Sequence, residues 1–259
     1  MNTALITGAS SGIGETFARE LAAQNTNLIL VARSQDKLDQ LAQQLQTQHP
    51  IQAEVIVQDL TAPGACQSVF ERVMQQGLQV DLLINNAGFG DYGNFTDRPL
   101  EKQVAMIQLN VTALVELTHL FLPGMKQRQS GGIINLASIA AFQPLPYISV
   151  YAATKAFVLS FTEAIWAENK DSGVQLLALC PGPTESSFFE VAEFPTTFNG
   201  KTTDYTPAEV VVREALKALK KNQSNLVTGG LGNQIVVNLS RFFPRETIVS
   251  LVEKQFRAT

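Results

Sequence analysis

Short apolar segments alternate along this chain with segments whose apolar residues recur at helical spacing. Apolar, β-branched runs predict strands at residues 3–7, 27–31, 53–58, 81–85, 132–137, 174–180 and 226–228. Amphipathic stretches predict helices at 12–24, 35–48, 64–76, 100–129, 151–169 and 207–221. Strands that are apolar throughout are typical of a parallel sheet covered on both faces. The alternation therefore predicts an α/β fold, a doubly wound, Rossmann-type parallel sheet of seven strands with helices on both faces.

The 259 residues contain no repeat, low-complexity tract or composition shift that would mark a linker, so we expect a single domain over 1–259. Two segments depart from the alternation. Residues 183–205 lack periodicity but carry Phe188, Phe189, Phe194 and Phe198, which favours a substrate lid. Residues 229–259 form a C-terminal extension with helical patterns at 232–243 and 244–257. This apolar extension either caps a cleft, packs on the core, or contacts a partner or a membrane surface.

A glycine-rich turn joins the first predicted strand to the first helix. Its sequence is Thr-Gly-Ala-Ser-Ser-Gly-Ile-Gly over 7–14. Backbone N–H groups and the helix dipole can bind a diphosphate there, and glycines permit its close approach. The spacing G-x3-G-x-G differs from G-x-G-x-x-G. The same letters contain the G-x-S-x-G nucleophile elbow of hydrolases, but only seven residues precede Gly8, which leaves no earlier strand for an oxyanion loop. We therefore predict dinucleotide binding.

The end of the second predicted strand bears on which dinucleotide binds. Enzymes that use NAD place an acidic residue there for the ribose 2′-hydroxyl, whereas an arginine accommodates a 2′-phosphate. Here Val31 and Ala32 are followed by Arg33, with Ser10 or Ser34 able to add a hydroxyl group. This pattern favours NADP(H), with NAD(H) as the alternative.

Tyr151 and Lys155 lie four residues apart on a predicted helix, so the phenol and the ammonium group share one face. A nearby cation can lower the pKa of a phenol from about 10 by roughly 1–3 units. Such a phenol can exchange a proton with a substrate oxygen. Ser138 ends a predicted strand, where α/β sheets place ligand-binding groups.

With these residues, the sequence resembles the short-chain dehydrogenase/reductase family over roughly residues 3–184. The resemblance implies that Tyr151 is the general acid/base, that Ser138 orients the carbonyl, and that Lys155 holds the nicotinamide ribose and lowers the tyrosine pKa. It implies that Asn110 supports a water chain to Lys155, and that the strand order is 3-2-1-4-5-6-7. The cofactor-binding residues that we expect from the turn, the second strand and the resemblance are Gly8, Ser10, Ser11, Gly12, Ile13, Gly14, Arg33, Asp59, Leu60, Asn86, Ala87, Gly88, Asn110, Tyr151, Lys155, Pro181, Gly182 and Thr184.

The substrate pocket should be lined by apolar loops, with candidates Phe89, Ile139, Phe142, Pro144, Phe188, Phe189 and Phe194. The predicted function is therefore an NADP(H)-dependent carbonyl reductase acting on a small hydrophobic ketone, aldehyde or secondary alcohol. Reduction of a 3-oxoacyl thioester is the nearest alternative. A non-catalytic dinucleotide-binding sensor or scaffold is the alternative from another class, although such relatives typically lose the tyrosine or lysine.

Composition and charge limit the kinds of partner that we expect for this chain. The net charge of −4 gives no electrostatic signal for nucleic acid. Two histidines without ligand spacing predict no metal, and two cysteines without paired spacing fit a reducing compartment. No signal peptide is seen and no stretch is expected to span a membrane, so we expect a cytoplasmic protein. By the resemblance, the helices at 100–129 and 151–169 imply a homo-oligomer, with a dimer as the first expectation.

Overall fold

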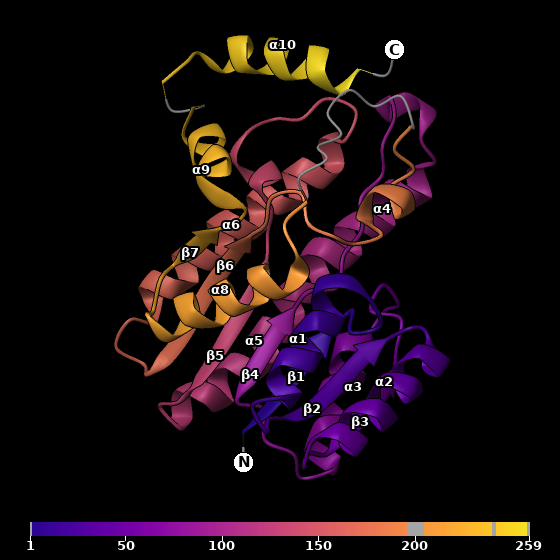
Figure 1. The fold of residues 1–259 in the computed structure, drawn as a ribbon, viewed down its shortest axis with the longest axis vertical. Helices are drawn as coiled ribbons and strands as arrows, with labels where there is room; N and C mark the ends of the chain where they lie inside the picture. The colour runs from indigo at the N-terminus through magenta and orange to yellow at the C-terminus, as the bar shows by residue number, and fades with distance from the viewer. Residues whose placement is uncertain (1, 196–204, 240–241, 258–259) are drawn as a thin grey trace.

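A computed structural model describes residues 2–195, 205–239 and 242–257. Its centre is one parallel sheet with strands β1 (Thr3–Thr7), β2 (Asn27–Ala32), β3 (Ala53–Val57), β4 (Leu82–Asn85), β5 (Gly131–Leu136), β6 (Val174–Cys180) and β7 (Asn225–Val227). The strand order is β3-β2-β1-β4-β5-β6-β7, and every neighbouring pair is parallel. The doubly wound sheet and the order expected from the resemblance are thus confirmed. Figure 1 shows the N-terminus at one end of the molecule and the C-terminal helix across the other.

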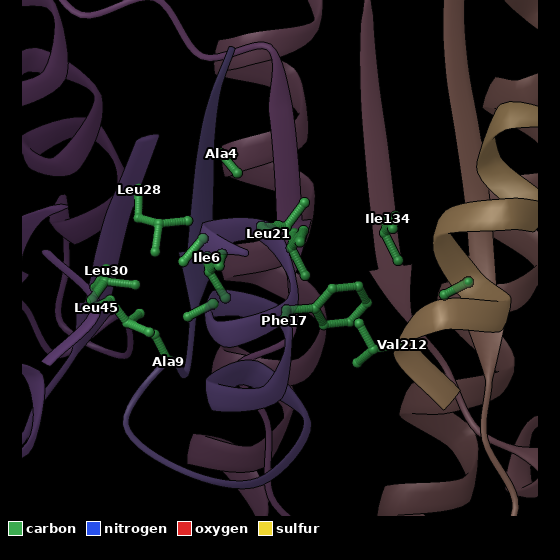
Figure 2. Packing of buried hydrophobic residues seen from close by; sticks show 14 of the residues in the cluster. Ala4, Ile6, Ala9, Phe17, Leu21, Leu28, Leu30, Leu45, Ile134 and Val212 are labelled. Atoms are coloured by element: carbon green, nitrogen blue, oxygen red, sulfur yellow. The ribbon is translucent and has the colours of Figure 1, made fainter. Parts of the chain in front are cut away.

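Helices cover both faces of the sheet. They are α1 (Gly12–Ala22), α2 (Gln35–Gln48), α3 (Ala65–Gln75), α4 (Leu100–Ile107), α5 (Leu114–Gln127), α6 (Ser149–Glu168) and α8 (Ala208–Lys220). Successive strand residues point to opposite faces, so Ala4 and Ile6 of β1 pack with α1, α2 and α8, whereas Leu5 packs with α3 and α5. On the first face, Phe17 of α1 is fully buried with Val212 of α8 (Figure 2). Because all the strands are parallel, their carboxyl ends lie at one edge of the sheet, between the two helical layers.

The helix predicted at 100–129 contains a break. Between α4 and α5, residues Gln108–Ala113 form a π-helical turn, which places Asn110 inside an irregular segment. Such turns are frequent at functional sites. Contrary to the sequence expectation, the helical run Leu100–Gln127 is by length and composition able to cross a membrane, since its most apolar 18-residue window has a mean hydropathy of 1.4. In this fold, Leu117, Phe121 and Met125 of the run pack against the sheet, and 39% of its most apolar window is buried.

The two irregular segments frame the carboxyl edge of the sheet. The ends of the 183–205 segment meet in a bridge between Thr184 and Thr206. This segment includes a short helix, α7 (Phe188–Val191), which is too short to show a sequence period. Residues 196–204, which include the predicted lid residue Phe198, lie outside the described residues. The C-terminal extension contains α9 (Gly230–Leu239) and α10 (Arg245–Phe256), and residues 240–241 between them are also outside the described part.

Candidate active site

The loops that follow β1, β2, β4, β5 and β6 line one cavity of about 710 Å³, a size typical of small-molecule sites. Ligands of open α/β sheets bind at this edge. Most of the predicted cofactor residues line the cavity: Gly8, Ser10, Ser11, Gly12, Ile13, Arg33, Asp59, Leu60, Asn86, Ala87, Gly88, Tyr151, Pro181, Gly182 and Thr184. Ser138 lines it as well. Gly14, Asn110 and Lys155 are not among the lining residues.

The glycine-rich turn is held against β2 and β4. Gly8 has a φ of +65°, which favours glycine, and its N–H donates to Val31 O at 2.8 Å. The Asn86 side chain donates to Thr7 O (2.9 Å) and Gly8 O (3.2 Å). A Cβ on Gly14 would collide with Gly8 O, so this glycine permits close packing rather than lining the cavity.

The first turn of α1 follows this glycine-rich loop. The Ser11 side chain makes no capping hydrogen bond, and Gly12 and Ile13 at the start of α1 line the cavity. An uncapped helix N-terminus in such a position fits a diphosphate.

Beyond β2 and β3, a positive and a negative side chain line the same cavity. Asp59 accepts hydrogen bonds from the Thr61 backbone N–H (2.9 Å) and hydroxyl (2.7 Å). These bonds, with a smaller effect of the Arg33 charge, lower the pKa of Asp59. Arg33 lines the cavity beside Asp59, and its planar guanidinium group is suited to bind a ribose phosphate.

Ser138 and Tyr151 both line the cavity, and their side chains are joined by a hydrogen bond. Ser138 follows β5 by two residues, and its hydroxyl accepts a hydrogen bond from Ala140 N–H at 3.1 Å. The Tyr151 ring is buried against Phe188, with 5.0 Å between ring centroids. Burial raises the pKa of Tyr151 to about 12, although its hydrogen bond with Ser138 lowers it in part. The predicted lowering of this pKa by Lys155 is therefore wrong for this arrangement, because desolvation dominates.

Lys155 lies one helical turn beyond Tyr151, on the shared face that the spacing predicts. Its Nζ is 5.7 Å from the Tyr151 ring centroid and donates to Leu136 O at 2.6 Å. The side chain is buried, and burial lowers the pKa of Lys155 to about 8, opposed by a small effect of Cys180. The Lys155 ammonium group is therefore buried next to the residues that line the cavity. At neutral pH it is charged in most of the molecules.

Asn110 connects the loop after β4 with α6. Its amide donates to Phe89 O (3.0 Å) and Thr154 Oγ1 (3.1 Å), and its Oδ1 accepts from Phe89 N–H (3.1 Å). A Cβ on Gly88 would lie 2.9 Å from Asn110 Oδ1 and 3.6 Å from Lys155 Nζ, so this glycine lets the two side chains approach the cavity. Its hydrogen bonds give Asn110 a positioning role, whereas the predicted water chain stays a prediction.

Sequence reasoning missed part of the cavity wall. Gln143, Leu145 and Ile148 line it from the loop after Ser138, and Asn233, Val236, Gln255 and Phe256 line it from the C-terminal extension. The lining by extension residues agrees with the first of the roles expected for this apolar segment, which is to cap a cleft. The sequence could not identify which of its residues face the cavity, because that depends on contacts with distant loops. Of the predicted substrate residues, Phe89, Ile139, Phe188, Phe189 and Phe194 line the cavity. Phe142 and Pro144 do not: Phe142 packs with Val158 and Val237 in a separate cluster, and Pro144 is exposed.

The family model described as short chain dehydrogenase matches residues 2–194. A very-long-chain 3-oxoacyl-CoA reductase from Anas platyrhynchos is 32% identical over 267 residues, covering 98% of this chain and 81% of the relative. A solved short-chain dehydrogenase from Sphingobium yanoikuyae in complex with NADPH superposes with a TM-score of 0.83 at 30% identity, covering 99% and 97% of the two chains. A bulky-bulky ketone specific alcohol dehydrogenase from Comamonas testosteroni gives 0.80 at 29% identity, covering 100% and 97%.

Proposed function

The chain belongs to the short-chain dehydrogenase family and is an oxidoreductase of carbonyl or alcohol groups, and on that premise we propose that it is an NADPH-dependent reductase of hydrophobic ketones. The observation that carries the proposal is the position of the Ser138–Tyr151 pair. Both groups line the same cavity as the phosphate-binding turn, and they lie beside the aromatic residues Phe188, Phe189 and Phe194.

The proposed chemistry uses the protonation states of the site. With a pKa raised to about 12, Tyr151 keeps its proton at neutral pH and can donate it to a substrate oxygen. The Ser138 hydroxyl would hydrogen-bond the same oxygen, so two donors stabilise the negative charge that develops there. When bound, reduced nicotinamide supplies the hydride to the carbonyl carbon. The buried Lys155 ammonium group adds positive charge behind Tyr151 and would bond a ribose hydroxyl.

NADPH rather than NADH is favoured by the groups beyond β2. Arg33 and Ser34 line the cavity there, and no acidic residue follows β2 directly. The structural relative from Sphingobium yanoikuyae, which is in complex with NADPH, supports this choice. The binding residues would be Gly8, 10–13, Arg33, Asp59, Leu60, 86–88, Lys155 and 181–184.

A hydrophobic substrate is favoured by the remaining wall. Leu145, Ile148, Val236 and Phe256 complete the apolar surface begun by the phenylalanines, while Gln143 and Gln255 contribute amide groups. Apolar walls with few polar groups are typical of sites for apolar ligands. The named preference of the Comamonas testosteroni relative for bulky ketones agrees with such a wall.

A 3-oxoacyl thioester is the second candidate substrate. It is supported by the similarity over nearly the whole chain to the Anas platyrhynchos reductase. A role as a dinucleotide-binding sensor is the alternative outside enzymes, and the presence of Asn110, Ser138, Tyr151 and Lys155 speaks against it.

The test is oxidation of NADPH, followed at 340 nm, over a panel of aliphatic, aryl and steroid ketones and 3-oxoacyl-CoA esters of increasing length. We expect turnover of bulky ketones with NADPH and a much lower kcat/KM with NADH. Faster turnover of the thioesters would favour the second substrate class. Turnover of no carbonyl together with tight NADPH binding would support a sensor, and a strong preference for NADH would contradict the role of Arg33.

A further inference from the structure

The aromatic part of the 183–205 segment rests directly on Tyr151. Phe188 lies against the Tyr151 ring and also packs on Phe189 and Phe194, whose centroids are 5.6 and 6.3 Å from its own. Phe194 packs in turn on Tyr92, with 4.8 Å between centroids. The position of this aromatic group therefore determines the shape of the space above the proposed catalytic hydroxyl.

A cluster of ion pairs lies beside this aromatic group. Asp91, whose carboxylate is fully buried, accepts hydrogen bonds from Arg98 (Nε, 2.8 Å) and Gln103 (Nε2, 2.5 Å), and Lys102 Nζ is 2.7 Å from Asp91 Oδ1. Burial alone would raise the pKa of Asp91, but the bonds from Arg98 and Lys102 lower it, so the group is ionised at neutral pH. Two cations, Arg98 just before α4 and Lys102 in its first turn, thus face one buried anion.

Glu193 supplies the second anion, and it comes from the aromatic segment itself. It accepts hydrogen bonds from Arg98 Nη2 (2.7 Å) and Lys102 Nζ (2.5 Å), which lower the pKa of Glu193. The cluster of Asp91, Arg98, Lys102 and Glu193 is therefore electrically balanced. Glu193 also adopts a φ of +59°, a left-handed conformation that is unfavourable for a residue with a Cβ. Its two cationic partners provide a physical reason why this turn is stable.

Backbone hydrogen bonds join the residues on either side of Glu193 to segments that line the cavity. Tyr92 N–H donates to Ala192 O at 2.8 Å, and Phe194 N–H donates to Phe189 O at 3.0 Å. The residues immediately before and after Glu193 are thus joined to the loop after β4 and to the aromatic group. Glu193 is not among the residues that line the cavity in the described part of the chain.

We propose that Glu193 is a positioning residue that clamps the aromatic segment onto Tyr151 and thereby sets the affinity for hydrophobic substrates. This inference rests on the proposed function. Loss of the clamp would increase the population of conformations in which Phe188 leaves Tyr151, and the apparent affinity for a substrate falls by the fraction of clamped molecules. The dinucleotide would contact other residues, so its binding would not change.

The test compares Glu193→Gln with Glu190→Gln, which removes a charge from the same segment at an exposed position with no ion pair to any of the described residues. Exposed ion pairs are individually weak, so we expect Glu193→Gln to raise the KM for a bulky ketone by about fivefold. The kcat at saturating ketone and the KM for NADPH should be unchanged. Glu190→Gln should behave as wild type, and Glu193→Asp, which keeps the charge, should recover part of the affinity.

Two further measurements distinguish the electrostatic clamp from a merely structural role of Glu193. They are the salt dependence of the ketone KM and the rate of amide hydrogen exchange. Screening by about 0.5 M KCl should raise the wild-type KM toward that of Glu193→Gln, whose own KM should stay constant. Backbone amides at 189–194 should exchange faster in Glu193→Gln than in Glu190→Gln, whether or not any ketone is turned over, which separates this inference from the proposed function. Equal ketone KM values, equal salt responses or equal exchange in the two variants would overturn the clamp.

Discussion

Burial shifts the pKa values of Tyr151 and Lys155 in opposite directions. It raises the pKa of the Tyr151 hydroxyl to about 12 and lowers that of the Lys155 ammonium group to about 8. Both shifts have the same cause, since a low-dielectric environment disfavours the charged form of each group. At neutral pH the phenol is protonated and the amine is mostly charged, which suits donation of a proton toward a carbonyl oxygen.

Replacement of Tyr151 by Phe tests this donation. The ring and its contact with Phe188 are retained, so we expect Tyr151→Phe to fold and to bind NADPH as wild type does. Loss of the acidic hydroxyl should lower kcat by about 100-fold or more. Steady-state kinetics with the best ketone, together with NADPH titration by fluorescence, provide the measurement. A variant with near-normal kcat would show that another group donates the proton.

Replacement of Lys155 by Met tests the electrostatic cost of burying the amine. Between pH 8 and 10.5 the unfolded lysine binds a proton that the folded one has released, so this residue destabilises the fold fully below pH 8 and less as the pH rises. The melting temperature of wild type should therefore increase relative to that of Lys155→Met between about pH 7.5 and 9.5. Cys180 is coupled to Lys155, but burial raises the pKa of Cys180 to about 12, above this pH range, so the difference isolates Lys155. A constant difference over this range would contradict the lowered pKa.

At the scale of elements, α10 forms part of the cavity wall although it is remote in sequence. Ile248, Val252 and Phe256 recur every four residues along one face of the helix; Ile248 and Val252 are buried in the same apolar cluster as Tyr151, and Phe256 packs against it. Tyr147 donates a hydrogen bond to Glu253 (2.8 Å), and Tyr92 donates one to Phe256 O (2.5 Å). Figure 1 shows α10 lying across the end of the molecule opposite the N-terminus. The docking of this helix therefore depends on one apolar face and two phenol hydroxyls.

Substitution of Ile248 by Ala should loosen α10 selectively. Removal of this buried side chain costs about 2–5 kcal/mol in packed sites, and a helix held by one face can open locally before the domain unfolds. We expect faster hydrogen exchange in residues 248–256 and a higher KM for bulky ketones, because Phe256 lines the cavity. Leu251→Ala, at a residue 57% exposed on the same helix, is the matched control. Exchange that is equal in the two variants would show that α10 is not anchored by this face.

At the scale of the whole molecule, apolar side chains remain exposed on the helices that precede and follow β5. Val104 and Ile107 of α4 and Phe157 of α6 are 46%, 44% and 43% exposed, and α4 packs beside α6. Exposed apolar residues that lie close together mark interaction surfaces. This surface supports the expectation of a homodimer that meets through these helices.

Charged substitutions on this surface should separate the subunits. We expect the double variant Ile107→Glu, Phe157→Glu to be monomeric by light scattering at micromolar concentration, where wild type should be dimeric. Burial of unpaired charges in an interface opposes association. Met74→Glu, at a comparably exposed residue of α3, should leave the assembly unchanged. A wild-type protein that is monomeric at this concentration would contradict the expectation.

The sequence by itself determined those features that depend on local repetition. The bounds of β1, α2 and β6 agree with the predicted ranges 3–7, 35–48 and 174–180, because a buried strand and an amphipathic helix each carry their own apolar period. The shared face of Tyr151 and Lys155 follows from helix geometry alone. The site at the carboxyl edge of the sheet follows from the order of strands and helices.

Only the tertiary structure decided features that depend on residues far apart in the chain. The pKa of Tyr151 is raised mainly by desolvation on burial, and the sequence spacing predicts the opposite direction. The π-helical turn at Asn110 and the contact of Tyr147 with Glu253, 106 residues away, leave no local pattern in the sequence. Burial and cavity shape are properties of the folded whole, because each depends on which distant side chains exclude water from a group.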